Sequence, residues 1–298
     1  ITNIRKMEIE KTPETIQSVQ FSPDSFFVDV GTTEGFRIYS SDPKWPVHTD
    51  RLREKGSIVF VQNVNNLVVY VRGGKQFPAK ELYIYDDDLD RDATKMLFNN
   101  EIKAIKVTET CLLVILEEKA YLFDLKYNEG VYKEPQMIKK FKTIENSKSL
   151  GCLLTSRMAS LVILPGISEN TIQIYNTIND ELLEYDVGDK PTAIGGNIYA
   201  GIFAWTNEDG TQIWLHKVDD GSLYKTLNRG KSYAEITSIV FDKYCFRMAV
   251  SSTKETVHIF ALPKELALNG KTEEELTESL KLEESLDSTR KSLPFSLL

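Results

Sequence analysis

A short strand pattern recurs six times along the chain, and this repeat constrains the fold more than any other feature. Each copy is five residues long and ends in an aliphatic residue followed by an aromatic ring or His. The copies occupy residues 35–39, 81–85, 119–123, 171–175, 212–216 and 256–260. Their last residues lie between 38 and 52 positions apart, close to the roughly 40–45 residues of a four-stranded propeller blade. The spacing predicts an all-β chain, a β-propeller of four-stranded blades with six blades visible in residues 1–262.

A second repeated element indicates the order of strands inside a blade. Residues 18–22 and 238–242 share a Ser, an aliphatic residue and a Phe, and one apolar strand separates each from the next copy of the main pattern. This is the order of successive antiparallel strands in one blade, and neighbouring blades then cover each other's faces. A jelly roll or sandwich accounts for alternating strands but not for a repeat of this period.

Composition and charge narrow the range of partners. The 298 residues are 41% hydrophobic, enough for a sizeable core, and the formal net charge is −8. This charge argues against nucleic-acid binding, so no nucleic acid is expected as a partner. Cys111, Cys152 and Cys245 are odd in number and lie in apolar runs, as expected for buried thiols in a reducing compartment. The longest apolar run, residues 111–116, is far below the roughly 20 residues that span a bilayer.

The two ends of the chain differ from the repeat. Residues 1–6 are charged and do not resemble a signal peptide, although the first residue is not Met. Residues 263–298 are rich in Glu, Lys, Ser and Leu, and a capping box at 272–275 predicts a short helix. We expect a charged excursion within or after the sixth blade, either solvated or amphipathic and touching a membrane. The apolar residues 293–298 fit membrane contact or a further strand, and the sequence does not decide between them.

Catalytic motifs were sought and none was found. The chain has His48, His216 and His258, but no HExxH, CxxC, P-loop, GxSxG or GxGxxG pattern. The acidic run 86–92 lacks the Gly and the distal Glu of an EF-hand loop, so we interpret it as a solvated turn. The prediction is a non-enzymatic protein without a cofactor or metal. An enzyme using the central channel of a propeller would need convergent catalytic groups that the sequence does not offer.

The segment Leu227-Asn-Arg-Gly230, with residues 234–241 and 249–260 after it, resembles the PROPPIN family of phosphoinositide-binding seven-bladed propellers. Members of that family carry a Phe/Leu-Arg-Arg-Gly turn, followed by a strand pair ending in Ser-Ser and Thr-Val-His-Ile-Phe. Residues 34–43 are similar to the family's first-blade motif, and residues 164–175 to the blade before the lipid sites. The resemblance covers most of residues 16–262 and implies a seventh blade beyond the six visible ones.

The resemblance implies a lipid-headgroup site on the last visible blade, and the residue types suit an inositol phosphate. Arg offers a planar fork of donors, Gly a close backbone approach, and the hydroxyls, Lys and His further donors. The candidates are Arg229, Gly230, Ser251, Ser252, Lys254, Thr256 and His258. Strand alternation predicts Thr256 and His258 on one face, with Val257 buried behind them. The alternative is that Arg229 forms a surface salt bridge and the hydroxyls only satisfy turns.

The family has a second lipid site beside this one, and here its pattern is degenerate. Asn228 replaces the first Arg of the double-arginine turn, Trp214 stands where another Arg is expected, and the 186–190 stretch has no His. The turn at 207–211 carries Glu208 and Asp209, which repel phosphate. The degenerate positions are Asn207, Thr211, Trp214 and Asn228.

By resemblance, the expected function is binding of phosphatidylinositol 3-phosphate or 3,5-bisphosphate at the one intact site. The chain would be a cytoplasmic scaffold, peripherally associated with autophagic, endosomal or vacuolar membranes. An autophagy-type protein partner is expected on the early blades. The alternative is a WD-repeat-like interaction propeller that has lost lipid binding and works only through protein partners.

Overall fold

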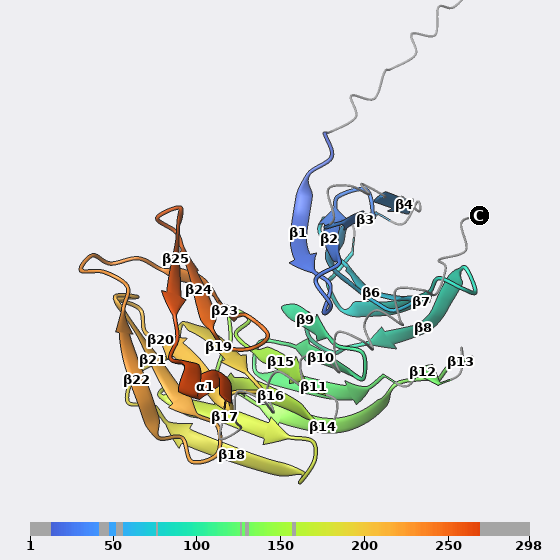
Figure 1. Ribbon diagram of the computed structural model, residues 1–298. Helices are drawn as coiled ribbons and strands as arrows, with labels where there is room; N and C mark the ends of the chain where they lie inside the picture. Colours follow the sequence, from blue (N-terminus) through green and yellow to red (C-terminus); the bar gives the residue numbers. More distant parts are fainter. Residues whose placement is uncertain are drawn as a thin grey trace, which may run out of the picture. The chain divides into compact units, whose positions relative to one another are not determined.

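The computed structural model describes residues 13–41, 48–51, 56–75, 77–125, 127–128, 131–156 and 159–268. The chain divides into two compact units, residues 1–149 and residues 150–298. In each unit three antiparallel sheets follow one another along the sequence (Figure 1). These sheets are the six blades of a β-propeller, and strands dominate the regular structure.

The first unit holds three four-stranded blades. Its strands are β1 (Ile16–Phe21), β2 (Phe27–Thr32), β3 (Phe36–Ser40), β4 (His48–Arg51), β5 (Ile58–Val64), β6 (Leu67–Arg72), β7 (Glu81–Asp86), β8 (Arg91–Leu97), β9 (Ala104–Val107), β10 (Cys111–Ile115), β11 (Lys119–Asp124), β12 (Tyr127–Asn128), β13 (Val131–Tyr132) and β14 (Gln136–Lys142). Strands adjacent in a blade are successive along the chain, except that the ribbon β12–β13 is inserted between β11 and β14.

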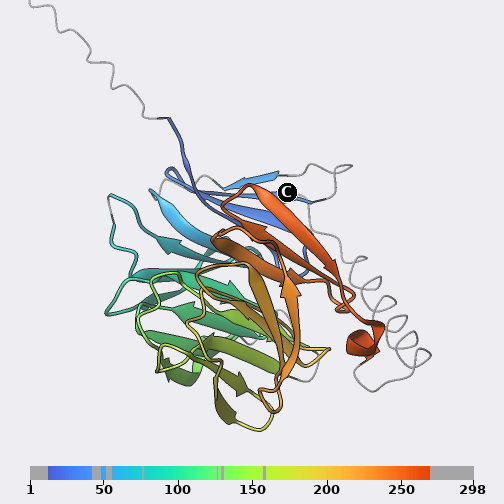
Figure 2. The same ribbon diagram turned by 90° about the vertical axis from the view of Figure 1, so that its left-hand side faces the viewer.

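The second unit holds two four-stranded blades and one three-stranded blade. Its elements are β15 (Cys152–Thr155), β16 (Ser160–Pro165), β17 (Thr171–Asn176), β18 (Glu181–Asp186), β19 (Ala193–Asn197), β20 (Ile202–Thr206), β21 (Gln212–Lys217), β22 (Leu223–Asn228), β23 (Ile236–Phe241), β24 (Arg247–Ser252), β25 (Thr256–Ala261) and α1 (Lys264–Leu268). The three-stranded blade is β23–β24–β25, and α1 follows it directly (Figure 2).

The six repeats of the strand pattern all fall on the third strand of a blade, namely on β3, β7, β11, β17, β21 and β25. The second element falls on β1 and β23, the first strands of their blades. The predicted propeller with six visible blades is confirmed. The seventh blade that the resemblance implies is not among the described residues.

Burial follows the position of a strand in its blade. The second strands β10, β16 and β20 are buried at every residue, and β6 at all but its last. The fourth strands β8 and β22 alternate between exposed and half-buried residues, as expected where only one face packs. One apolar core joins the blades β5–β8 and β9–β14, and others join the successive blades of the second unit.

Buried polar side chains join the three blades of the first unit. The Asp29 carboxylate accepts a hydrogen bond from the Asn63 backbone amide across the first two blades, at 2.7 Å. Gln62 donates through Nε2 to the Phe21 carbonyl at 3.2 Å and accepts through Oε1 from the Val107 amide at 2.8 Å. Since unpaired polar groups are costly to bury, these bonds fix how successive blades align.

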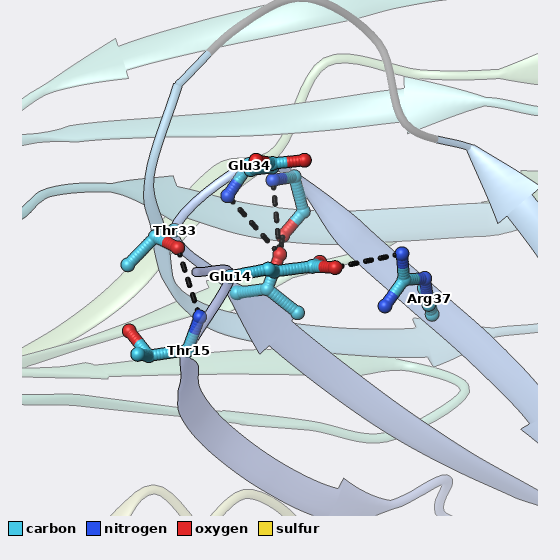
Figure 3. A network of polar contacts seen from close by, with 7 residues as sticks. Glu14, Thr15, Thr33, Glu34 and Arg37 are labelled. Carbon is cyan, nitrogen blue, oxygen red and sulfur yellow. Dashed lines mark hydrogen bonds and ion pairs between the residues drawn. The ribbon is translucent and has the colours of Figure 1, made fainter. Parts of the chain in front are cut away.

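The residues before β1 are tied to the β2–β3 turn (Figure 3). Glu14 Oε2 and Arg37 Nη2 form an ion pair at 2.8 Å. The Thr15 amide donates to Thr33 Oγ1, and the Thr33 amide donates to the Thr15 carbonyl, both at 3.0 Å. The arginine of the first-blade motif at 34–43 therefore holds the chain entering the blade against its third strand.

The helix α1 lies at the start of the predicted excursion 263–298, and its Leu266 packs into the core of the second unit. The capping box at 272–275, the helix expected after it and the apolar residues 293–298 lie outside the described residues. In the part of the chain that the structure describes, no helix has the length and apolar character needed to cross a bilayer.

Candidate functional site

Three loops meet at one end of the last two blades, and they carry most of the residues of both predicted lipid sites. We call residues 207–211, 229–235 and 252–256 the loop cluster. Its backbone hydrogen bonds run from the Arg229 amide to the Thr211 carbonyl (2.8 Å), from Ala234 to Asp209 (3.2 Å) and from Thr253 to Glu235 (2.9 Å). The cluster is therefore a single hydrogen-bonded surface built from two blades.

Arg229 is buried within the loop cluster, with 8% of its surface exposed. Its Nε donates to the Gly210 carbonyl and its Nη2 to the Ser232 carbonyl, each at 2.5 Å. The guanidinium thus fastens the β20–β21 turn to the β22–β23 link, instead of forming the surface salt bridge considered as the alternative. Nη1 has no hydrogen-bond partner among the described residues.

Two glycines of the loop cluster serve different purposes. Gly210 has φ +59°, and a Cβ there would lie 2.0 Å from the Ala234 carbonyl oxygen, so only glycine fits this close approach. Gly230 has no positive φ, and a Cβ there would meet nothing within 4 Å. The fold therefore requires glycine at 210 but not at 230, where the backbone beside Arg229 faces open space.

Each hydroxyl group predicted for the intact site lies within hydrogen-bond distance of another hydroxyl group. Ser251 Oγ and Thr237 Oγ1 lie 2.7 Å apart, and Ser252 Oγ and Thr256 Oγ1 lie 3.2 Å apart. Ser252 is buried, whereas Lys254 at the tip of the turn is exposed. Thr237 and the Ser232 carbonyl contact predicted site residues but were not themselves predicted, because these contacts depend on strand register and on the path of the β22–β23 link.

The predicted burial of Val257 is wrong, since 64% of this residue is exposed. Val257 and Ile259, which is 69% exposed, share the face of β25 that no described residue covers. Thr256 and His258 have the same parity along β25, as predicted, and His258 is half-buried. The His258 ring stacks on Phe260 with centroids 6.4 Å apart.

Trp214, one of the degenerate positions, is half-buried and packs against the core of the second unit. Its ring stacks on Trp205 with centroids 4.5 Å apart and planes 21° apart, and Trp205 is only 2% exposed. The two residues are directly opposite in the β20–β21 pairing, as Val250 and His258 are in β24–β25. Trp214 therefore occupies the register position of His258 but supplies packing instead of a donor to phosphate.

The remaining degenerate positions carry amides and carboxylates. Asn207 Nδ2 donates to Asp189 Oδ2 at 2.9 Å, and Asn228 Oδ1 accepts from Gln212 Nε2 at 3.4 Å. Thr211 contributes its backbone carbonyl to the Arg229 and Gly230 amides. The neighbouring Glu208 and Asp209 side chains are exposed. This side of the loop cluster is therefore unfavourable for a phosphate.

Metal binding finds no support in the described part of the chain, where no group of three or more His, Cys, Asp or Glu side chains could hold an ion. In the acidic run 86–92, the buried Asp86 accepts hydrogen bonds from the amides of Asp88 and Leu89, at 3.0 and 3.2 Å. Asp86 therefore stabilises the turn after β7.

Solved structures with this fold include Kluyveromyces lactis Hsv2 with a complete loop 6CD. That protein is 17% identical, with a TM-score of 0.69 over 86% of this chain and 76% of its own. A complex of KlAtg21 with the coiled coil of AgAtg16 gives a TM-score of 0.67 at 16% identity, over 84% and 82% of the two chains. At such identities the similarity establishes the fold.

Relatives in sequence carry names from autophagy. Autophagy-related protein 18e of Arabidopsis thaliana is 22% identical over 239 residues, which are 78% of this chain and 62% of that protein. SVP1-like protein 2 of Pichia angusta is 23% identical over 257 residues, 83% and 70% of the two chains. This chain thus spans about three-fifths of the length of the Arabidopsis relative. A sequence model of the PROPPIN family matches residues 15–295 in one continuous stretch, and with the six blades this match makes the chain a member of the PROPPIN family.

Proposed function

We propose that the chain binds phosphatidylinositol 3-phosphate or the 3,5-bisphosphate at the loop cluster, as a peripheral membrane scaffold in autophagy or endolysosomal traffic. The observation that carries the proposal is the pair Arg229 and Gly230. A glycine that the backbone does not require faces open space beside a guanidinium with an unused nitrogen. A phosphate there can approach the backbone closely and accept from Nη1.

The other predicted residues surround this point from the β24–β25 side. Lys254 can add a mobile positive charge, and Ser251, Ser252 and Thr256 add hydroxyl donors. His258 can donate from a half-buried ring on the same face as Thr256. The site combines one fixed cation with hydroxyl groups that are already hydrogen-bonded. These side chains therefore lose little conformational entropy when a ligand binds.

One headgroup per chain is proposed, because the degenerate side has Trp214 and Asn228 where the family pattern has arginines. Trp214 is committed to packing, and the exposed Glu208 and Asp209 repel an anion. Titration with soluble inositol 1,3-bisphosphate should give one equivalent per chain. Two equivalent headgroups bound would contradict the single site.

Arg229→Ala is expected to abolish flotation with vesicles containing either phosphoinositide, whereas wild type floats with these and not with neutral vesicles. The substitution removes both the phosphate donor and the contacts to Gly210 and Ser232. Thermal unfolding must therefore be measured alongside. If folded wild type bound neither phosphoinositide, the function supported would be that of a propeller that works only through protein partners.

Gly230→Ala separates ligand binding from loop structure. The added methyl group meets no atom within 4 Å, so the unfolding free energy should stay within about 0.5 kcal/mol of wild type. Vesicle binding should fall several-fold, because the methyl group lies where the headgroup must approach. Unchanged binding by this variant would exclude close approach at Gly230.

The second candidate function is a propeller that works only through protein partners, in the cytoplasm and on the same membranes. The observation that favours it is that Arg229 Nε and Nη2 are already bonded to backbone carbonyls. We also propose a protein partner on the early blades. The similar protein KlAtg21 has a protein partner in its complex with the coiled coil of AgAtg16. Neither role requires an enzymatic activity of this chain.

A further inference from the structure

We propose that Ser232 is a phosphorylation site, at which the added phosphate takes the free donors of Arg229 and excludes the lipid headgroup. The inference rests on the proposed function, because it assigns the regulation of the same site. It names the modified atom, Ser232 Oγ, and the donors for which the phosphate and the headgroup compete.

The segment that carries Ser232 is accessible to an enzyme. Lys231, Ser232 and Tyr233 are all exposed. The backbone amides of residues 231–233 donate no hydrogen bond to a described residue, whereas the Ala234 amide donates to the Asp209 carbonyl at 3.2 Å. Ser232 therefore belongs to a short stretch of exposed loop that a kinase can reach.

The sequence after Ser232 suits a kinase that selects an acidic residue at the third position after the acceptor. Glu235 occupies that position. Thr177, Thr206 and Ser252 also have a carboxylate there, but Thr177 is half-buried and the other two are buried. Within the described ranges, Ser232 is thus the one exposed acceptor of this kind.

The modification is a phosphoryl transfer from ATP, catalysed by such a kinase. The bond between the γ-phosphorus and the oxygen that bridges it to the β-phosphate breaks, and a bond from that phosphorus to Ser232 Oγ forms. ADP leaves, and the hydroxyl proton passes to the catalytic base of the kinase. The product carries a charge of about −1.5 to −2 at pH 7 and three strong acceptor oxygens.

The backbone already places Ser232 beside the donors of Arg229. The Ser232 carbonyl accepts a hydrogen bond from Nη2 at 2.5 Å. Nη1, which is bonded to the same carbon of the guanidinium, has no partner among the described residues. Because the hydroxyl belongs to the same residue as this carbonyl, a phosphate on it lies within reach of Nη1. Hydrogen bonds between arginine and phosphate are among the strong ones.

A phosphate on Ser232 and a lipid headgroup need the same donors. The proposed headgroup site uses Arg229 Nη1 and the open backbone at Gly230, two residues before Ser232. A tethered phosphate is present at an effective concentration of roughly 1 mM, so a headgroup has to displace it before binding. Phosphorylation is therefore expected to release the chain from the membrane.

The charge of the loop cluster acts in the same direction. Three cations and four carboxylates give the cluster a formal charge of −1, and a phosphate makes this about −3. An anionic membrane surface then repels the cluster more strongly. The cations are Arg229, Lys231 and Lys254, and the carboxylates are Glu208, Asp209, Glu235 and Glu255.

The first test installs phosphoserine at position 232 of the full-length chain during translation, so that the result does not depend on a kinase. Ser222→phosphoserine is the matched control, because Ser222 is an exposed serine at the opposite end of β22 from Arg229. Flotation is measured with vesicles that contain phosphatidylinositol 3-phosphate, the 3,5-bisphosphate or neither. Ser232→phosphoserine should weaken binding at least about tenfold, and Ser222→phosphoserine should leave it unchanged.

Phosphorus NMR tests where the phosphate lies, without any lipid. A phosphate paired with Arg229 should lose its last proton at lower pH than the same phosphoserine in a free peptide of residues 226–238, because nearby cations favour the doubly charged form. Equal titration midpoints in the chain and the peptide would overturn the pairing with Arg229.

The modification itself is tested with MgATP and a kinase of the stated specificity. We expect mass spectrometry to locate a phosphate on Ser232 in the folded chain. Ser232→Ala should remove this phosphate, and Glu235→Gln should slow its addition several-fold. A folded wild type that takes up no phosphate at Ser232 would overturn the assignment of the modification site.

The same experiments separate this inference from the proposed lipid function. If the unmodified chain and Ser232→phosphoserine float equally well, the regulation is overturned and the lipid function stands. If the unmodified chain does not float, while its phosphate at position 232 titrates at lower pH than in the peptide, the lipid function is overturned and the phosphate site stands.

Discussion

The unfolding free energy of Asp29→Asn, relative to wild type, is expected to rise by about 3 kcal/mol between pH 5 and pH 8. Asp29 is completely buried between the first two blades. Burial raises its pKa from 3.8 to about 7, against the opposing effect of the hydrogen bond from the Asn63 amide, and the Asp24 charge raises it further. Wild type therefore buries a neutral acid at pH 5 and an ionised one at pH 8.

The sign follows from proton binding. Between pH 3.8 and 7 the folded chain retains a proton on Asp29 that the unfolded chain has lost. Stability due to this group is therefore highest at low pH, falls as pH rises towards 7, and levels off above it. Asparagine does not titrate, so this part of the pH dependence disappears in the variant.

Urea denaturation at pH 5, 6, 7 and 8 measures the difference between the two proteins. The difference in unfolding free energy between the two proteins at pH 5 is the internal control, because it contains the pH-independent effect of placing an amide beside Asn63. A difference that is constant from pH 5 to pH 8 would show that Asp29 does not titrate in this range.

Gly210→Ala is expected to destabilise the second unit by roughly 2–4 kcal/mol and to abolish vesicle binding. The new Cβ would lie 2.0 Å from the Ala234 carbonyl oxygen, at a residue with φ +59°. The β20–β21 turn must then move away from the β22–β23 link. That movement breaks the contact between Arg229 and the Gly210 carbonyl.

Denaturation and hydrogen exchange of residues 229–235 measure this effect. Gly230→Ala is the matched control, because the same added methyl group meets no atom within 4 Å there. We expect faster exchange in Gly210→Ala and wild-type exchange in Gly230→Ala. Equal stability of the two variants would mean that the close approach at Gly210 does not hold the loop cluster together.

The strands and their order could be predicted because the repeat is local in sequence. The copies at 35–39 and 256–260 fall on β3 and β25 because a third strand needs the same alternation in every blade. The alternation of side chains along a strand predicts which residues share a face, but not which of the two faces packs against another element. Val257 was expected to be buried, and it is exposed because coverage depends on elements far away in the sequence.

The loop cluster was predicted as a set of residues but not as a set of contacts. Arg229 is a candidate because residues 227–230 resemble the family's turn and because hydroxyl, Lys and His side chains follow it in the sequence. Its contacts to Gly210 and Ser232 depend on where two loops of different blades meet. Trp214 was identified as a departure from the family pattern. Its stacking on Trp205 follows from the β20–β21 register, which the sequence does not specify.

Arg229 holds two carbonyls in place whether or not a lipid is present. If the proposed function holds, this arginine is under two separate selective pressures, one from the ligand and one from the shape of the turn. A descendant that stopped binding lipid would still be selected to keep the arginine, because losing it would loosen the junction of two blades. Retention of the arginine alone in a related chain is therefore a record of loop architecture, whereas retention of glycine at 230, which the fold does not require, is the better indicator of lipid binding.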